Sequence, residues 1–141
     1  MAVTGIHHVA LTVNDWGKSK AFYNGVLGAI GAQEVMGGEG APHKESKGHW
    51  CAFAAPGFML TLWEAKPDLR GNSFQIYNVG LHHVAFSSAS RADVDELFGK
   101  LKTMGANILD APQEYPYVPG YYALFFTDPD GMKLEYVHIP G

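Results

Sequence analysis

An internal repeat constrains the fold of this 141-residue chain more than any other feature of its sequence. The segment GIHHVAL at Gly5–Leu11 returns as GLHHVAF at Gly80–Phe86. Two further pairs follow in the same order and at nearly the same offset, GAQ at 31–33 with GAN at 105–107, and GFMLT at 57–61 with GMKLE at 131–135. We therefore expect one domain, 1–141, made of two copies of a module (approximately 1–66 and 79–141) joined by a linker at 66–78.

Each module has the pattern of a strand, a helix and three further strands. The expected strands are Ile6–Val13, a segment around Gln33, His49–Ala54 and Phe58–Trp63, then Leu81–Ser87, a segment around Ile108, Tyr121–Thr127 and Met132–His138. Asp15 is the expected cap of the first helix, and Ser90 with Asp93 predicts the start of the second. The pattern predicts an α+β fold of two βαβββ modules whose sheets form one cup.

Composition excludes several classes of protein. Ten Lys and Arg against 14 Asp and Glu give a net charge of −4, which argues against a nucleic-acid binder because such proteins need clustered positive charge. Cys51 is the only cysteine, so an intrachain disulfide and a zinc-finger framework are excluded. No apolar run approaches the ~20 residues that span a bilayer, and no secretory signal is visible. We expect a cytoplasmic protein, and the low charged fraction of 17 % is compatible with a homodimer.

Alternation along the strands indicates which side chains lie opposite the apolar, helix-facing set. His8 and His83 occupy equivalent places in the two modules, and Glu135 lies in the last strand, after the turn Asp128–Gly131. Two imidazoles and one carboxylate suit a divalent transition metal and leave coordination positions for a substrate. We therefore expect one divalent ion per chain, Fe²⁺, Mn²⁺, Ni²⁺, Co²⁺ or Zn²⁺. A merely packed or solvent-facing histidine is the alternative for each imidazole taken alone.

The same alternation predicts the lining of a small-molecule pocket around this ligand set. The expected pocket residues are Ala10, Thr12, Cys51, Thr61, Trp63, Ala85 and Phe125. If the third strand follows the register of the repeat, His49 and Cys51 point into the cup, where His49 could act as a general base or a further ligand. A water-bonded strand-edge histidine and a small buried cysteine are the alternatives. The aromatic segment 115–122 could line the pocket mouth.

The stretches GIHHVALTV, GLHHVAF and FFTDPDGMKLE resemble the vicinal oxygen chelate superfamily, which includes glyoxalase I, bleomycin-resistance proteins, fosfomycin-resistance transferases and extradiol dioxygenases. The resemblance covers essentially the whole chain, and it places the metal ligands on His8, His83 and Glu135. It implies an enzyme whose metal chelates vicinal oxygens of a small molecule and acts as a Lewis acid. A non-catalytic binding protein of the bleomycin-resistance type is the alternative, but such a protein has no need of three metal ligands.

Departures from the branches of the superfamily narrow the chemistry. Thr61 stands where glyoxalase I enzymes carry a fourth, carboxylate ligand, and Glu64 could replace it only if the strand register slipped. Methylmalonyl-CoA epimerases use an amide at that place. Phe125 stands where extradiol dioxygenases place a catalytic tyrosine, although Tyr121 and Tyr122 are nearby as candidate catalytic residues. Ala10 stands where fosfomycin-resistance transferases have threonine. Lyase, isomerase, dioxygenase and thiol-transferase activities thus remain open.

Overall fold

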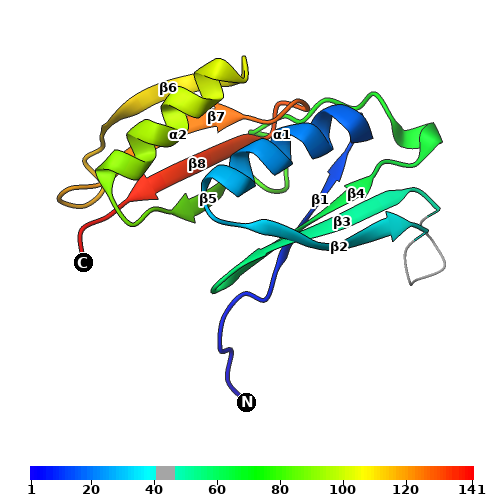
Figure 1. Ribbon diagram of the computed structural model, residues 1–141, viewed down its shortest axis with the longest axis horizontal. Helices are drawn as coiled ribbons and strands as arrows, with labels where there is room; N and C mark the ends of the chain where they lie inside the picture. Colours follow the sequence, from blue (N-terminus) through cyan, green and yellow to red (C-terminus); the bar gives the residue numbers. More distant parts are fainter. Residues whose placement is uncertain (41–46) are drawn as a thin grey trace. The chain divides into compact units, whose positions relative to one another are not determined.

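The structure is a computed structural model that describes residues 1–40 and 47–141. The chain divides into two units, Met1–Asn72 and Ser73–Gly141, and the division falls inside the stretch 66–78 that the repeat predicts as a linker. Each unit has one α-helix and one four-stranded sheet in the order βαβββ, and the first unit ends with a short 3₁₀ helix. Figure 1 labels these elements along the chain. No helix in the described ranges is long and apolar enough to cross a membrane.

The first unit has the predicted βαβββ order. Its elements are β1 (Val9–Val13), α1 (Trp16–Ala29), β2 (Gln33–Glu39), β3 (His49–Ala55), β4 (Phe58–Glu64) and the short 3₁₀ helix η1 (Pro67–Leu69). The strand order in the sheet is β1-β4-β3-β2, with β1 parallel to β4 and the other pairs antiparallel. A crossover through α1 is therefore needed to bring the first strand beside the last.

The second unit repeats this topology. Its elements are β5 (Val84–Ser87), α2 (Arg91–Thr103), β6 (Asn107–Glu114), β7 (Tyr122–Thr127) and β8 (Lys133–His138). The strand order is β5-β8-β7-β6, and β5 is again parallel to β8. The α+β fold of two βαβββ modules, predicted from the repeat, is confirmed.

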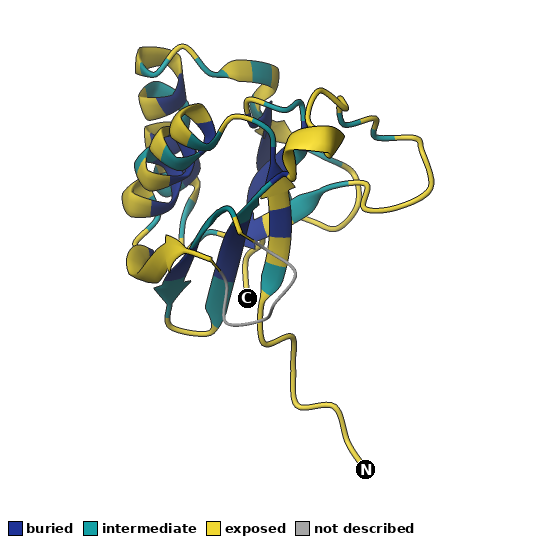
Figure 2. Ribbon diagram, turned by 90° about the vertical axis from the view of Figure 1, so that its right-hand side faces the viewer, coloured by how far each residue is buried: buried dark blue, intermediate teal, exposed yellow. Residues whose placement is uncertain are grey.

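The helices begin where the sequence places their caps. The side chain of Asp15 accepts a hydrogen bond from the backbone N–H of Lys18, and that of Ser90 accepts one from Asp93, so each cap satisfies a backbone donor of the first turn. Both helices bury one side and expose the other (Figure 2). The buried residues are Ser19, Phe22, Tyr23, Val26 and Leu27 in α1, and Val94, Leu97 and Leu101 in α2.

Each sheet has a helix-covered face and an opposite face, which we call the open face. The open face of the first unit carries Ala10, Thr12, Trp50, Ala52, Thr61 and Trp63, and that of the second unit carries Ala85, Ala123, Phe125, Lys133, Glu135 and Val137. These sets follow from the strand registers, because paired residues on neighbouring strands point to the same side of a sheet.

The first strand of each unit is shorter than the sequence predicts. The expected strands begin at Ile6 and Leu81, whereas β1 and β5 begin at Val9 and Val84. The parallel ladders start only where Val9 meets Leu60 and Val84 meets Leu134, so the residues before them have no sheet partner. Both histidine pairs therefore lie immediately before a strand.

Candidate functional site

The open face of the second unit brings His83 and Glu135 together. Because Ala85 pairs with Glu135 in the β5–β8 ladder, the residue just before β5 lies beside the same carboxylate. His83 Nε2 lies 3.1 Å from Glu135 Oε2. Glu135 is only 2 % exposed, whereas the side chain of His83 is 33 % exposed. A buried carboxylate thus faces an imidazole that solvent reaches.

Tyr121 contacts the other oxygen of the Glu135 carboxylate. Its hydroxyl donates a hydrogen bond to Glu135 Oε1. Burial and the bond to Glu135 both raise the pKa of Tyr121 above its ordinary value, since both disfavour the phenolate. Tyr121 is therefore a neutral hydrogen-bond donor at physiological pH, and it orients Glu135 rather than taking protons.

Tyr122, the second tyrosine expected at the site, lies on the helix-covered face. Its hydroxyl donates to Asp95 Oδ1 at 2.8 Å, and the Arg91 guanidinium lies 4.8 Å from its ring centroid. Both partners belong to α2. The expectation that Tyr122 is close to the ligand set is wrong, because adjacent strand residues point to opposite faces.

Aromatic rings surround the His83–Glu135 pair on the open face of the second unit. Phe125 is the register partner of Glu135, and its ring centroid lies 6.2 Å from that of His83. The Tyr115 ring packs edge-on against Phe125 at 5.3 Å and lies parallel to the Tyr117 ring at 5.8 Å. Tyr115 and Tyr117 thus extend the aromatic surface of Phe125 beside His83 and Glu135, and aromatic walls next to a few polar groups are typical of small-molecule sites.

The first unit holds the repeat-equivalent residues in the same registers. Ala10 pairs with Thr61 as Ala85 pairs with Glu135, so His8 and Thr61 correspond to His83 and Glu135. The neighbouring histidines also correspond, with His7 Nδ1 2.9 Å from His8 Nδ1 and the same contact at 2.8 Å between residues 82 and 83. The first unit therefore presents an imidazole and a hydroxyl where the second presents an imidazole and a carboxylate.

Thr61 lies on the open face and has an internal hydrogen-bond partner. Trp63 Nε1 donates to Thr61 Oγ1 at 2.9 Å, and the Trp63 ring stacks on Trp50 at 5.7 Å. Ala10 and Thr12 face the same side and are exposed. Ala10, Thr12, Thr61 and Trp63 therefore share the open face with Trp50, which the sequence analysis missed. That this face lines a pocket stays a prediction.

His49 is on the helix-covered face, so its expected position in the cup is wrong. Its Nδ1 lies 2.7 Å from Glu64 Oε2, its Nε2 lies 2.9 Å from Glu39 Oε1, and its ring stacks on Trp16 of α1 at 5.5 Å. The β3–β4 register places Ala52 opposite Thr61, which sends the odd-numbered residues of β3 to the other face. The hydrogen bond to Glu64 raises the pKa of His49.

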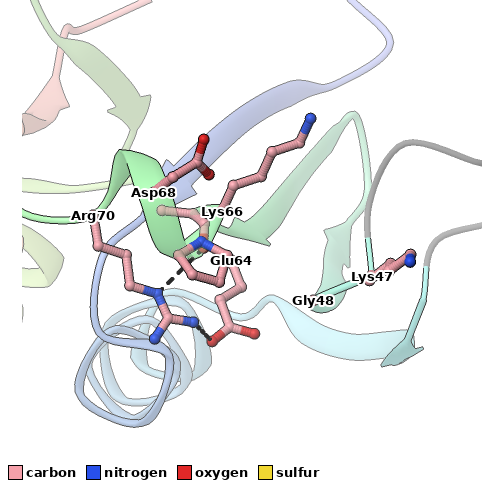
Figure 3. A pocket seen from close by; sticks show the side chains of 8 residues that line it. Lys47, Gly48, Glu64, Lys66, Asp68 and Arg70 are labelled. Carbon is pink, nitrogen blue, oxygen red and sulfur yellow. Dashed lines mark hydrogen bonds and ion pairs between the residues drawn. The ribbon is translucent and has the colours of Figure 1, made fainter.

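Glu64 and Cys51 also lie on the helix-covered face. Besides its contacts with His49, Glu64 forms an ion pair with Arg70 (Figure 3), and the backbone N–H of His49 lowers the pKa of its carboxyl. The register of β4 shows no slip that would turn Glu64 toward Thr61. Cys51 is fully buried, and burial raises the pKa of its thiol to about 11, so it is a packing residue and not a pocket nucleophile.

The residues present fit a divalent metal in their chemistry. Within neither unit do three His, Cys, Asp or Glu side chains of the described residues come together. The second unit supplies one imidazole and one carboxylate at contact distance, and Tyr121 donates to the carboxylate oxygen that His83 does not contact. Such an outer partner is what fixes a ligating carboxylate in metal sites.

Two βαβββ units in one chain are characteristic of one class of fold. A comparison with protein families identifies this class over nearly the whole chain. The model of the Glyoxalase/Bleomycin resistance protein/Dioxygenase superfamily matches residues 5–136. The chain belongs to this superfamily, which confirms the resemblance seen in the sequence.

Several proteins are similar to this chain along most of their length. Protein YqjT of Bacillus subtilis is 31 % identical over 134 residues, covering 94 % of this chain and 97 % of YqjT. The metallothiol transferase FosB of Lysinibacillus sphaericus is 29 % identical over 136 residues, covering 96 % and 83 %. The crystal structure of a superfamily domain from Frankia sp. EAN1pec matches with a TM-score of 0.79 and 28 % identity, covering 99 % and 94 %.

Proposed function

We propose that the protein is a metal-dependent enzyme that acts on a small molecule with vicinal oxygens. In this proposal His8, His83 and Glu135 hold one divalent ion, Fe²⁺, Mn²⁺, Ni²⁺, Co²⁺ or Zn²⁺, in the cytoplasm. The observation that carries the proposal is the buried Glu135 carboxylate, set between the His83 imidazole and the Tyr121 hydroxyl on the open face.

The burial of Glu135 is the physical reason for expecting a cation. A carboxylate taken out of water needs compensating hydrogen bonds or a positive partner. One of its oxygens accepts a hydrogen bond from the Tyr121 hydroxyl, and the other faces the solvent-accessible imidazole of His83. An ion bound there compensates the charge of Glu135, and when bound it supplies Lewis-acid chemistry that stabilises negative charge on substrate oxygens.

The surrounding residues have separate tasks. Tyr121 holds Glu135 in one orientation by donating to Oε1. Phe125 and Tyr115 form an apolar wall beside His83, which keeps water from that side of the ligands. Thr61, whose hydroxyl accepts a hydrogen bond from Trp63, adds a neutral group in the first unit and does not act as a fourth ligand.

Thiol transfer is the reaction class that we would test first. Phe125 cannot exchange a proton, and Tyr121 remains a neutral donor, so the proton-handling tyrosine of a ring-cleaving enzyme is missing at its usual place. The similarity to FosB, which is named a metallothiol transferase, supports an added thiol as the nucleophile. The glyoxalase I-like alternative loses its support because Glu64 faces away from Thr61.

Elemental analysis tests the metal assignment. We expect about one divalent ion per chain in the wild type, almost none in Glu135→Gln, and the wild-type amount in Glu114→Gln, a matched control at an exposed ion pair with Arg91. Equal metal in both variants would overturn the assignment. A wild type without metal that still binds small molecules would favour the bleomycin-resistance type of binding protein.

A further inference from the structure

Lys133 brings a positive charge to the open face of the second unit. It lies in β8 two residues before Glu135 and therefore on the same face. Its Nζ lies 4.5 Å from the ring centroid of Phe125, the register partner of Glu135. The Cα atoms of residues two apart in a strand are ~6.6 Å apart, and both Lys133 and Glu135 have Phe125 as a neighbour, so the ammonium and the carboxylate share one area of the open face.

The Lys133 ammonium has no carboxylate partner among the described residues. Its Nζ lies over the Phe125 ring, whereas the Lys20 ammonium forms an ion pair with Glu34. The neighbouring Glu135 carboxylate is already engaged by Tyr121 and His83. The aromatic ring thus holds the lysine over the open face and leaves its hydrogen-bond donors available.

Charge on this face indicates what the lysine can bind. A divalent ion held by neutral imidazoles and a single carboxylate keeps a net positive charge, and Lys133 adds to it. A second cation beside a metal is unfavourable in a site for neutral ligands, because like charges repel at short range. It is favourable when the ligand brings more than one negative group.

We propose that Lys133 is a specificity-determining residue that binds an anionic group of the substrate, such as a carboxylate or phosphoryl group, while vicinal oxygens of the same molecule face the metal ligands. This inference rests on the proposed function of the site. It limits the substrates to small anions whose second charged group lies a few bonds from the chelating oxygens.

Binding of matched probes to the zinc-loaded full chain tests the inference. Catechol offers two vicinal oxygens alone, and 2,3- and 3,4-dihydroxybenzoate add a carboxylate at two positions. Calorimetry should show at least one of the acids binding about tenfold tighter than catechol to the wild type. Lys133→Met should remove most of this preference, and Lys133→Arg should retain it, as should Lys100→Met, a control at an exposed lysine of α2.

The outcomes separate the two proposals. Normal zinc content with the same acid-to-catechol ratio in wild type and Lys133→Met would overturn the role of Lys133 and leave the metal site standing. A chain that binds no zinc or other divalent ion would overturn the proposed function and this inference with it. A loss of the preference in Lys133→Arg as well as in Lys133→Met would show that the position acts through shape rather than charge, and would also overturn the inference.

Discussion

At the scale of single residues, Glu135 and its two partners explain most of what the site can do. The carboxylate is buried, yet each oxygen has a neighbour on the open face, Tyr121 on one side and His83 on the other. A group that orients a ligand contributes to metal affinity without touching the metal. In the proposed metal site the tyrosine is therefore a positioning residue, and we expect its removal to be visible in metal affinity before it is visible in folding.

Tyr121→Phe should weaken metal binding about 10- to 100-fold, because Glu135 Oε1 loses its donor. Competition with a chromogenic chelator measures the effect. Tyr122→Phe is the matched control, since that hydroxyl donates to Asp95 on the helix-covered face. Equal affinities in the two variants would contradict a positioning role for Tyr121.

Thr61→Glu should strengthen metal binding by about tenfold or more, because a carboxylate is a far better ligand than a hydroxyl. Thr61 is the register equivalent of Glu135, so the new carboxylate takes the repeat-equivalent place. Thr12→Glu adds the same charge to the same face, opposite Trp63, and should change affinity little. If both substitutions act alike, general electrostatics rather than ligation explains the gain.

At the scale of the elements, His49 connects three strands of the first unit. From β3 it contacts Glu39 of β2 and Glu64 of β4. Glu64 in turn forms an ion pair with Arg70, just after η1. β2 is an exposed edge strand, and this chain of charges connects its last residue, Glu39, to β3 and β4. Its contribution depends on whether the imidazole is protonated.

The pH dependence of stability should reveal this connection. Glu64 raises the pKa of His49 above its ordinary 6.5, so the folded state binds the proton more tightly than the unfolded state. The stabilisation is therefore complete below pH 6.5 and is lost as the pH rises through the raised value. Glu64, with its lowered pKa, contributes above its ordinary value and loses this contribution in acid.

Denaturant unfolding of wild type and His49→Gln between pH 5 and 9 measures this contribution. The stability difference between the two proteins should be largest near pH 5 to 6 and should shrink with rising pH. A difference that stays constant or grows with pH would show that His49 acts only through packing on Trp16.

Prediction from the sequence succeeded where a pattern was repeated and failed where a strand is apolar on both faces. The repeat and the helix caps Asp15 and Ser90 were enough to predict the order of elements in both modules. In β3 the run Trp50–Phe53 shows no alternation, so only the register with β4 reveals which residues face α1. At the start of β7, two adjacent tyrosines, Tyr121 and Tyr122, likewise gave no sign of which one faces Glu135 and which faces α2.

At the scale of the whole molecule, the duplication explains both the likeness and the difference of the two units. Each unit presents a histidine before its first strand, but only the second has a carboxylate opposite, Glu135 against Thr61. The proposed assignment of one ion to His8, His83 and Glu135 therefore takes donors from each unit. The homodimer compatible with the low charged fraction stays a prediction that light scattering in solution can measure.

Catechol cleavage should be slow or absent even after anaerobic reloading with Fe²⁺. Phe125 lies beside His83, where it can neither donate nor accept a proton. The assay follows the yellow ring-fission product from catechol and 2,3-dihydroxybiphenyl. Rapid colour formation would contradict the argument from Phe125.

The ligand set itself can be read by pulsed electron paramagnetic resonance on the Mn²⁺-loaded protein, which counts coordinated imidazole nitrogens. The wild type should show two coordinated imidazoles, and His8→Ala and His83→Ala should show one each. His138→Ala, a control whose imidazole lies near the Ser88 carbonyl, should keep two. A wild-type signal without imidazole, or one that His8→Ala leaves unchanged, would contradict a metal site built from both units.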